Sequence, residues 1–303
     1  MRHGRYPFII GFLFAPVTLY VVFVIWPYLQ AFYIAMNAWR GFAVPPRWIG
    51  FDNFSRMLFE DDRFWRAVWH NGLLLITLPL ITIVIALFFS FLLSVGGKSK
   101  GGDMAGIWGS KFYRVVFFLP QVLAVPIIAV LFQTVYRPNE SGLINGALMK
   151  LGLDPILFMI DPQLALPSII AVLVWQAVGF YVVLFSAGMG SIPKDLYEAA
   201  ELDGASRTRM FFNVTLPLLR DTMQVAWVYL GIAAFDAFAI VNVLAIADGG
   251  PDGATTVLAL EIYRAYGKND FGYASALGVA LFFLTITFAA LTLRVTKREA
   301  IEF

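Results

Sequence analysis

Residues 193–219 read PKDLYEAAELDGASRTRMFFNVTLPLL, a polar stretch in a chain that is otherwise dominated by apolar residues. Its first part, Lys194 to Asp203, is rich in helix-forming residues, and Pro193 suits the first turn of a helix. Gly204 follows directly and can adopt the left-handed conformation that ends many helices. The pattern therefore predicts a short helix, a glycine turn and a second helix, all too polar to span a bilayer.

The first of these predicted helices is amphipathic. Leu196, Ala199 and Ala200 share one face by helical spacing. The acidic residues spread over the other faces, and they are Glu198, Glu201 and Asp203. A short amphipathic helix between two apolar segments is the type of element that contacts another surface.

Composition places the chain in a membrane. Of its 303 residues 60% are hydrophobic and 14% charged, and the mean hydropathy is +0.76. A net charge of +2 argues against nucleic acid as a partner. The absence of cysteine excludes disulfides and thiolate chemistry, and two histidines, His3 and His70, do not suffice for a metal site.

Six apolar segments are long enough to cross a hydrocarbon core, which takes about 20 helical residues. The predicted fold is an all-α transmembrane domain over residues 1–303, with spans at about 8–38, 72–95, 112–136, 164–190, 217–244 and 272–295. The first segment follows Arg2 and Arg5 but exceeds the roughly 7 to 15 apolar residues of a secretory signal, so we expect an uncleaved span. Pro120 and Pro126 predict a break in the third.

Two of the connecting segments have informative compositions. Arg40 to Asn71 is amphipathic and rich in tryptophan, which predicts a segment at the membrane interface. Residues 96–99, GGKS, are similar to the end of a phosphate-binding loop, but that loop needs a glycine where Leu92 stands, and it follows a strand. We therefore expect no nucleotide site in this chain.

Basic residues favour one set of connections. With six spans, both termini and the loop at 191–216 lie on one side, which carries Arg2, Arg5, Lys98, Lys100, Lys111, Arg114, Lys194, Arg207, Arg209, Arg220, Arg294, Lys297 and Arg298. The opposite side is rich in acidic residues, namely Asp52, Glu60, Asp61, Asp62, Glu140, Asp154, Asp161, Asp248, Asp252, Glu261 and Asp270. The positive-inside rule then predicts that the termini and the polar loop are cytoplasmic.

Asp236 is the most notable residue within a predicted span. A carboxylate at membrane depth is costly unless it is paired, hydrated or protonated, so Asp236 either serves function or ties the fifth span to a neighbour by a hydrogen bond. Aromatic, amide and hydroxyl groups that suit a sugar occur nearby in the spans, although each also suits helix packing: Trp175, Gln176, Tyr181, Tyr229 and Asn242. The spans contain no pattern of catalytic residues, so we expect no catalysis by this chain.

The polar loop resembles the EAA loop of the membrane subunits of bacterial ATP-binding-cassette importers. The matching residues are Glu198, Ala199, Ala200, Asp203, Gly204, Ala205 and Phe212, followed by LPLL at 216–219. The resemblance implies that residues 198–205 form the coupling helix that sits in a cleft of a separate ATPase. An ordinary interfacial helix between two spans is the alternative interpretation.

Other segments are similar to the carbohydrate-uptake members of that family. They are IGFDNFSRML (49–58), FFLPQVLAVPIIAVLF (117–132), GLINGAL (142–148), the GGP loop with Gly249, Gly250, Pro251 and Thr256, and GYASALGVALFF (272–283). The resemblance implies a sugar permease subunit in the bacterial inner membrane. Its implied partners are a second permease chain, two ATPase subunits that use ATP and Mg²⁺, and an extracytoplasmic solute-binding protein, with no cofactor bound by this chain itself.

Two alternatives stay open at this point. A secondary transporter or channel driven by an ion gradient would use Asp236 as its ion site and would need no ATPase. An importer of the same family could instead carry an amino acid, a polyamine or a phosphate ester. The sequence does not identify a particular sugar.

Overall fold

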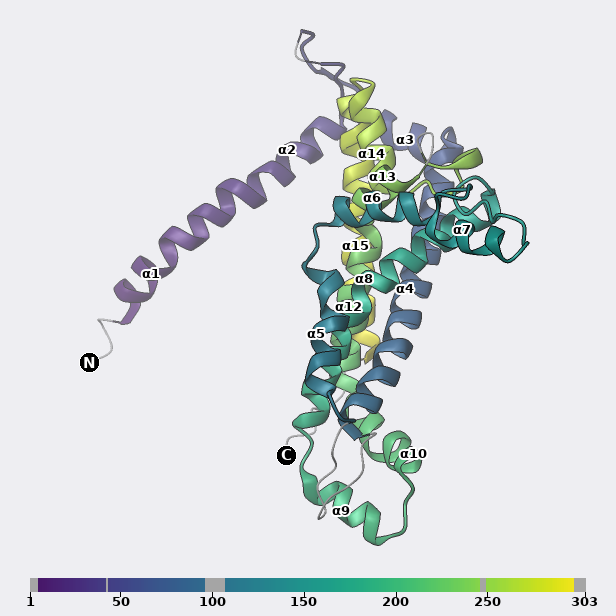
Figure 1. Ribbon diagram of the computed structural model, residues 1–303. Coiled ribbons are helices and arrows are strands. Elements are labelled where there is room, and N and C mark those ends of the chain that lie inside the picture. Colours follow the sequence, from purple (N-terminus) through teal and green to yellow (C-terminus); the bar gives the residue numbers. More distant parts are fainter. Residues whose placement is uncertain (1–4, 42, 96–106, 246–248, 297–303) are drawn as a thin grey trace. The chain divides into compact units, whose positions relative to one another are not determined.

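The computed structural model describes residues 5–41, 43–95, 107–245 and 249–296 (Figure 1). Several residues used above lie outside this part of the chain: Arg2, the GGKS segment with Lys98 and Lys100, Asp248, Lys297 and Arg298. Contacts divide the chain into two compact units. The first contains Met1–Trp65 and Leu258–Leu284, and the second contains Arg66–Val257 and Thr285–Phe303.

The first unit begins with a long helical segment that runs through α1 (Arg5–Tyr20), the π-turn η1 (Val21–Ile25) and α2 (Trp26–Ala35). A two-residue hairpin follows, in which β1 (Asn37–Ala38) pairs antiparallel with β2 (Arg47–Trp48), Asn37 opposite Trp48. The remaining elements are α3 (Asp52–Phe59), α14 (Leu258–Gly267) and the first part of α15 (Phe271–Thr296).

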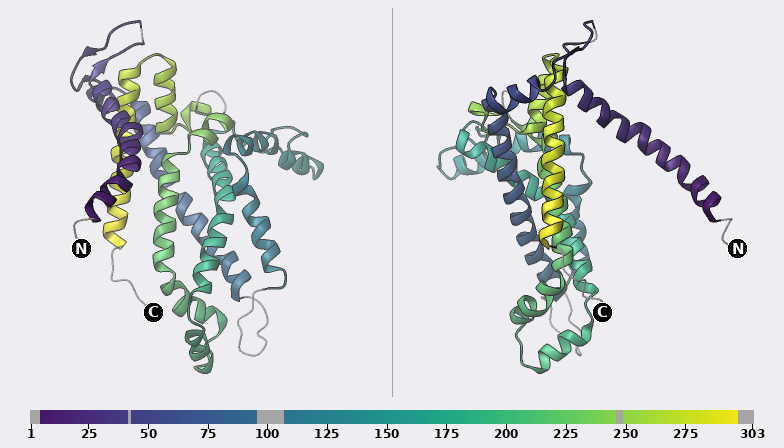
Figure 2. Two further views of the ribbon diagram at one scale, coloured as in Figure 1. Left: turned by 90° about the vertical axis from the view of Figure 1, so that its left-hand side faces the viewer. Right: turned by 180° about the vertical axis from the view of Figure 1, so that it is seen from behind.

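The second unit is a helical bundle. Its elements are most of α4 (Asp62–Val95), α5 (Ser110–Val122), α6 (Val125–Val135), α7 (Leu143–Lys150), α8 (Pro162–Gly190), α9 (Lys194–Leu202), α10 (Arg207–Met210), η2 (Phe211–Thr215), α11 (Leu216–Leu218), α12 (Arg220–Phe235), α13 (Phe238–Leu244), the 3₁₀ turn η3 (Pro251–Gly253) and the end of α15. Helices α9 and α10 lie at one end of this unit, and α6 and α7 lie at the other (Figures 1 and 2).

The prediction of an all-α membrane fold is confirmed. Four helical segments of the described chain are long and apolar enough to cross a bilayer, namely Gly11–Ala35, Asp62–Ser94, Pro162–Gly190 and Phe271–Arg294. Two further segments are broken helices, Ser110–Val122 with Val125–Val135 at 99° and Arg220–Phe235 with Phe238–Leu244 at 45°. By length and composition, the described residues therefore contain four candidate spans, or up to six if each bent pair is one span.

Helix α4 begins before the predicted second span. The span was expected from Gly72, whereas one continuous helix begins at Asp62. Asp61 starts this helix, because its carboxylate accepts a hydrogen bond from the Arg63 backbone N–H at 2.9 Å. The polar residues between Asp62 and Asn71 are compatible with a helix. Their low hydropathy therefore indicates more polar surroundings for this part of α4, and the backbone stays helical.

The predicted break in the third span is confirmed. It falls at Leu123 and Ala124, whose backbones are extended. Proline has no backbone N–H and disfavours helical geometry in the residue before it, so Pro126 suits the first turn of a new helix and not the middle of an old one. Beyond the break, α6 packs against α13, while α5 packs against α8.

Helices α5 and α8 approach each other at a glycine. A Cβ atom on Gly179 would lie 1.7 Å from the Phe117 carbonyl oxygen. The backbones of α5 and α8 are therefore in direct contact here, with no room for a side chain. Ser90 on α4 donates a hydrogen bond to the Val182 carbonyl at 2.9 Å, which ties a third helix to the same part of α8. These contacts fix the core of the bundle.

Gly179→Ala is expected to destabilise the fold. Displacing α5 to make room for the methyl group should cost about 1 to 3 kcal/mol, as overpacking of a core does. The control is Gly190→Ala in the same helix, where a Cβ atom meets nothing within 4 Å. Thermal unfolding in detergent should show a lowered midpoint for Gly179→Ala alone, and equal midpoints for the two variants would contradict the close contact.

Candidate coupling helix and solute pathway

Helix α9 forms as the sequence predicts. Pro193 precedes it with an extended backbone, the helix runs from Lys194 to Leu202, and Asp203 caps its end. Gly204 has a φ of +75°, the left-handed geometry expected there. The Ala205 backbone N–H then donates to the Ala200 carbonyl at 2.9 Å, which satisfies one of the last carbonyls of α9.

The second helix also begins as predicted. The Ser206 hydroxyl accepts a hydrogen bond from the Arg209 backbone N–H at 3.3 Å and so caps α10. The chain continues through η2 and α11 into α12, with a short irregularity at Leu219. The polar loop is thus a helical hairpin that leads directly into the next apolar helix.

One side of α9 packs against the rest of this hairpin. The Tyr197 side chain is 8% exposed and packs with Ile192 and Met210. Its hydroxyl lies 3.0 Å from the Thr215 hydroxyl. Burial raises the pKa of Tyr197 above its ordinary value, although the hydrogen bond to Thr215 acts in the opposite direction, so the phenol stays neutral near pH 7.

The three apolar residues expected on one face of α9 have different surroundings. Ala200 packs against the buried cluster, but Leu196 and Ala199 are exposed. Tyr197 takes the buried position because Thr215 supplies the partner that its hydroxyl needs. The outward face is therefore apolar at Leu196, Ala199 and Leu202, and Leu202 is 89% exposed.

The six predicted coupling residues occupy one continuous element. Ala200 and Ala205 are half-buried against the Tyr197 cluster. The four others are exposed on α9 and its turn, and they are Glu198, Ala199, Asp203 and Gly204. The exposed residues form a small surface with apolar and acidic groups that is available to a partner. The packing of Ala200 and Ala205 against the Tyr197 cluster holds this surface in place.

Asp236 lies at the second broken helix. It caps the end of α12, where its backbone N–H donates to the Ala233 carbonyl at 3.1 Å, and its side chain is exposed. Tyr229, 65% exposed, lies two turns earlier on the same face. An exposed carboxylate at a helix end is available to a ligand or a partner, which weighs against the alternative that Asp236 is a buried tie between two helices.

The other predicted pathway residues fall into different surroundings. Tyr181 on α8 is buried, whereas Tyr229 on α12 is exposed. Gln176 on α8 is half-buried, and Asn242 on α13 is exposed. Trp175 lines an apolar groove between α4, α5 and α8, and its ring meets Phe132 edge-on at 5.2 Å. Tyr229 and Asp236 thus lie along the same face of α12, whereas Trp175 lines the apolar groove.

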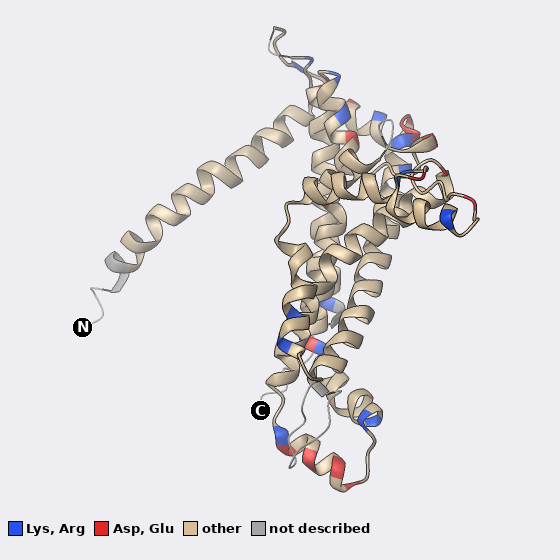
Figure 3. Ribbon diagram, viewed as in Figure 1, with Lys and Arg blue, Asp and Glu red and all other residues tan. Residues whose placement is uncertain are grey.

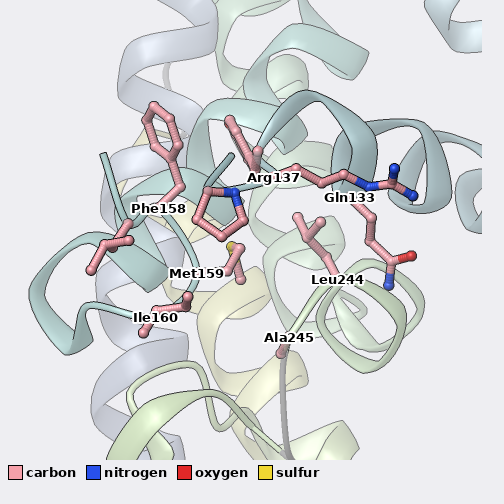
Figure 4. A pocket seen from close by; sticks show the side chains of 10 residues that line it. Gln133, Arg137, Phe158, Met159, Ile160, Leu244 and Ala245 are labelled. Atoms are coloured by element: carbon pink, nitrogen blue, oxygen red, sulfur yellow. The ribbon is translucent and has the colours of Figure 1, made fainter. Parts of the chain in front are cut away.

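Sequence reasoning missed a pocket of about 330 Å³ at the end of the second unit that carries α6 and α7 (Figure 4). Tyr136 and Phe158 stack at 4.7 Å in its wall, and the Tyr136 hydroxyl donates to the Ser168 carbonyl. Gln133 and Arg137 project to one side of it (Figure 4). The sequence did contain one indication of this pocket, because Gln133 and Arg137 are polar residues spaced one helical turn apart at the end of an apolar segment.

The segments outside the polar loop that carry the family resemblance mainly build structure. In the first unit, the Asn53 side-chain amide donates to the Ala35 and Asn37 carbonyls at 2.8 and 3.0 Å, and a Cβ atom on Gly272 would lie 2.0 Å from the Asn37 carbonyl oxygen. In the second unit, Asn145 bonds to both backbone groups of Ile156, donating at 2.9 Å and accepting at 2.7 Å. These residues hold loops and helix ends in place.

A polar cluster adds to this framework in the first unit. Arg56 pairs with Asp270 at 2.8 Å and stacks on the Tyr273 ring at 4.0 Å from its centroid. The Tyr273 hydroxyl donates to Asp61 at 2.5 Å. The described residues contain no group of three His, Asp or Glu side chains that could hold a metal ion.

Comparison with known proteins identifies the family. Residues 73–299 match the family described as binding-protein-dependent transport system inner membrane component. The diacetylchitobiose uptake system permease protein NgcF of Streptomyces coelicolor is 41% identical over 98% of this chain and 84% of its own. The trehalose/maltose transport system permease protein MalF of Thermococcus litoralis is 30% identical over 92% of this chain and 90% of its own.

A solved structure has the same fold. A chain of a bacterial ABC transporter involved in the import of alginate superposes with a TM-score of 0.80 at 24% identity, over 97% of this chain and 96% of that chain. Several helices long and apolar enough to cross a membrane, together with this family match, identify a multi-pass membrane subunit of a transport system. The chain belongs to the binding-protein-dependent transport system inner membrane component family.

Proposed function

We propose that this chain is the permease subunit of an ATP-driven importer that moves a carbohydrate delivered by an extracytoplasmic binding protein. Membership of a binding-protein-dependent family over residues 73–299 carries this proposal. Relatives at 41% and 30% identity are named for diacetylchitobiose and for trehalose and maltose. The solute would be a mono- or oligosaccharide or a derivative of one, and because the relative at 41% identity is named for diacetylchitobiose, N-acetylated amino sugars are the first class to assay.

The orientation follows from charge. Charged residues gather at the two ends of the second unit (Figure 3). The end that carries α9 is rich in basic residues, and those described are Lys111, Arg114, Lys194, Arg207, Arg209 and Arg220. Under the positive-inside rule this end is cytoplasmic. If each bent pair is one span, an even number of six spans supports the proposal that both termini are cytoplasmic as well.

ATP hydrolysis is assigned to a separate subunit. The chain contains no complete phosphate-binding motif, and its relatives are permease proteins. The complete transporter would contain this chain, a second permease, two ATPase subunits that use ATP and Mg²⁺, and the solute-binding protein. This chain itself binds no cofactor and performs no catalysis.

Coupling would use the outward face of α9. Leu196, Ala199 and Leu202 give the ATPase an apolar contact, and the small side chain of Ala199 lets the two surfaces approach closely. Behind this face, Tyr197 is fixed to Thr215, which lies in the helical segment that leads to α12. A movement of the ATPase would therefore pass to α12 as a rigid displacement.

The solute would pass the exposed face of α12. Tyr229 supplies an aromatic face and Asp236 a hydrogen-bond acceptor, with Tyr181 and Gln176 contributed by α8. The 45° break beside Asp236 ends one hydrogen-bonded helix and leaves polar groups that need water or a ligand. A sugar, with many hydroxyl groups, suits such surroundings.

Leu202→Asp is expected to detach the ATPase. Losing a buried leucine contact costs about 2 kcal/mol, which corresponds to more than about tenfold in affinity, and an acid in an apolar contact adds to that loss. The control is Leu151→Asp, at the opposite end of the unit and also exposed. Mild-detergent purification of the tagged chain should lose the ATPase in the first variant only, and its retention there would contradict the coupling assignment.

Asp236→Asn is expected to weaken solute handling without affecting assembly. A hydrogen bond to a charged group contributes about 1.5 to 3 kcal/mol, so the apparent KM for sugar uptake should rise roughly tenfold or more. The matched control is Asp221→Asn, an exposed carboxylate near the start of the same helix. Uptake by Asp236→Asn with unchanged KM and rate would remove Asp236 from the pathway, and uptake by this chain without any ATPase would favour an ion-driven carrier.

A further inference from the structure

The break between α12 and α13 leaves carbonyl groups that α12 does not satisfy by its own helical pattern, as at the end of any helix. The Asp236 backbone N–H serves two of them, because it donates to the Ile232 and Ala233 carbonyls at 3.3 and 3.1 Å. In an unbroken helix the Ala234 carbonyl would accept from the Phe238 N–H, but Phe238 here begins α13. The Ala234 carbonyl accepts its hydrogen bond from a neighbouring helix instead.

Asn71 on α4 supplies this donor. Its side-chain amide donates to the Ala234 carbonyl at 3.0 Å. Asn71 is 1% exposed and Ala234 is 0% exposed, so water has no access to this bond. The two helices are close here, because a Cβ atom on Gly231 would lie 3.1 Å from the Leu75 side chain. An apolar side chain at position 71 would leave a buried carbonyl without a donor, which is unfavourable.

A second hydrogen bond from α4 shows what distinguishes Asn71. Ser90 on the same helix is also buried, and its hydroxyl donates to the Val182 carbonyl at 2.9 Å. Val182 lies inside the continuous helix α8, where the helical pattern already provides a donor for its carbonyl. The bond from Ser90 therefore adds to an intact helix, whereas the bond from Asn71 serves a carbonyl at a helix end.

The same part of α4 also holds the loop that contains η3, after α13. Arg66 donates to the Asp252 carbonyl at 3.1 Å, and His70 Nδ1 donates to the Thr256 carbonyl at 2.8 Å. Asp252 has a φ of +54°, a strained backbone conformation that its surroundings must hold in place. Side chains of α4 between positions 66 and 71 thus bind backbone carbonyls on both sides of α13.

We propose that Asn71 is a positioning residue of the solute pathway, which stabilises the break before α13 through the Ala234 carbonyl and thereby fixes the position of Asp236. Asp236 follows Ala234 by two residues and caps α12 with an exposed side chain, so a change of chain direction at the break would move its carboxylate. Asn71 is buried and acts through this contact, without touching the solute. The inference rests on the proposed role of Asp236 in the pathway.

The first test combines two substitutions in vesicles that contain the complete transporter. Asn71→Leu removes the donor and should raise the apparent KM for sugar uptake roughly tenfold, with a much smaller effect on the maximal rate. Added to Asp236→Asn, it should raise KM by less than about twofold, because both changes act through one carboxylate. An equal rise in both backgrounds would indicate a general effect on the fold and would overturn the proposal.

The matched control for this test is Ser90→Ala, which removes a buried hydrogen bond from the same helix and should leave KM unchanged. A rise in KM for Ser90→Ala equal to that for Asn71→Leu would also count against a particular role of Asn71. If the leucine variant does not assemble, Asn71→Ala removes the same donor without adding bulk.

The second test does not use the transported solute. The chain contains no cysteine, so Asp236→Cys introduces a single thiol into it at the break. The rate at which a small maleimide labels this chain in the complete transporter should change several-fold when Asn71→Leu is added, but not when Ser90→Ala is added. Equal rates in all three chains would overturn the proposal. A rate that responds only to Asn71→Leu supports the positioning of residue 236 even if Asp236→Asn leaves uptake unchanged, in which case the pathway assignment alone is lost.

Discussion

Inside the hydrocarbon core of a bilayer, every backbone N–H and C=O group must find its partner within the protein. The chain meets this constraint with long helices such as α4 and α8, and it departs from it at two places, the 99° break before α6 and the 45° break before α13. Each break leaves backbone groups that a straight helix would have satisfied. The functional proposals concern what the chain does at the second of these places and at the hairpin that joins α8 to α12.

The two breaks have different chemical surroundings. Beside the first, the groove between α4, α5 and α8 is lined mainly by apolar side chains. At the second, an exposed aspartate stands at the helix end with a tyrosine on the same face. The proposed solute pathway uses the second break, because the hydroxyl groups of a sugar need hydrogen-bonding partners.

Sequence alone predicted the helical class, the polar hairpin and the break in the third span, because these depend on local chemistry. Proline and glycine act on the backbone of their own neighbourhood, as Pro126 and Gly204 show. The start of helix α4 and the burial of Tyr197 on α9 were not predicted. The first depends on the Asp61 cap, and the second depends on Thr215, 18 residues further along the chain, whose hydroxyl lies within hydrogen-bonding distance of the Tyr197 hydroxyl.

The same distinction applies to the candidate site. The coupling residues are adjacent in sequence, so a local pattern finds them together on α9. The pathway candidates come from α8, α12 and α13, and their grouping depends on how those helices pack. Trp175 and Gln176 are neighbours in sequence, yet only Trp175 lines the apolar groove. Hydropathy along one chain does not show which of two adjacent residues lines such a groove.

The most direct measurement is the sidedness of the two ends of the second unit. The chain has no cysteine, so Leu202→Cys on α9 and Leu151→Cys after α7 each introduce a single exposed thiol. A membrane-impermeant maleimide should label Leu151→Cys in cells with a permeable outer envelope and Leu202→Cys only in inverted membrane vesicles, where added ATPase subunit should protect it. Labelling of Leu202→Cys from outside would place α9 beyond the reach of any cytoplasmic ATPase and would contradict the account.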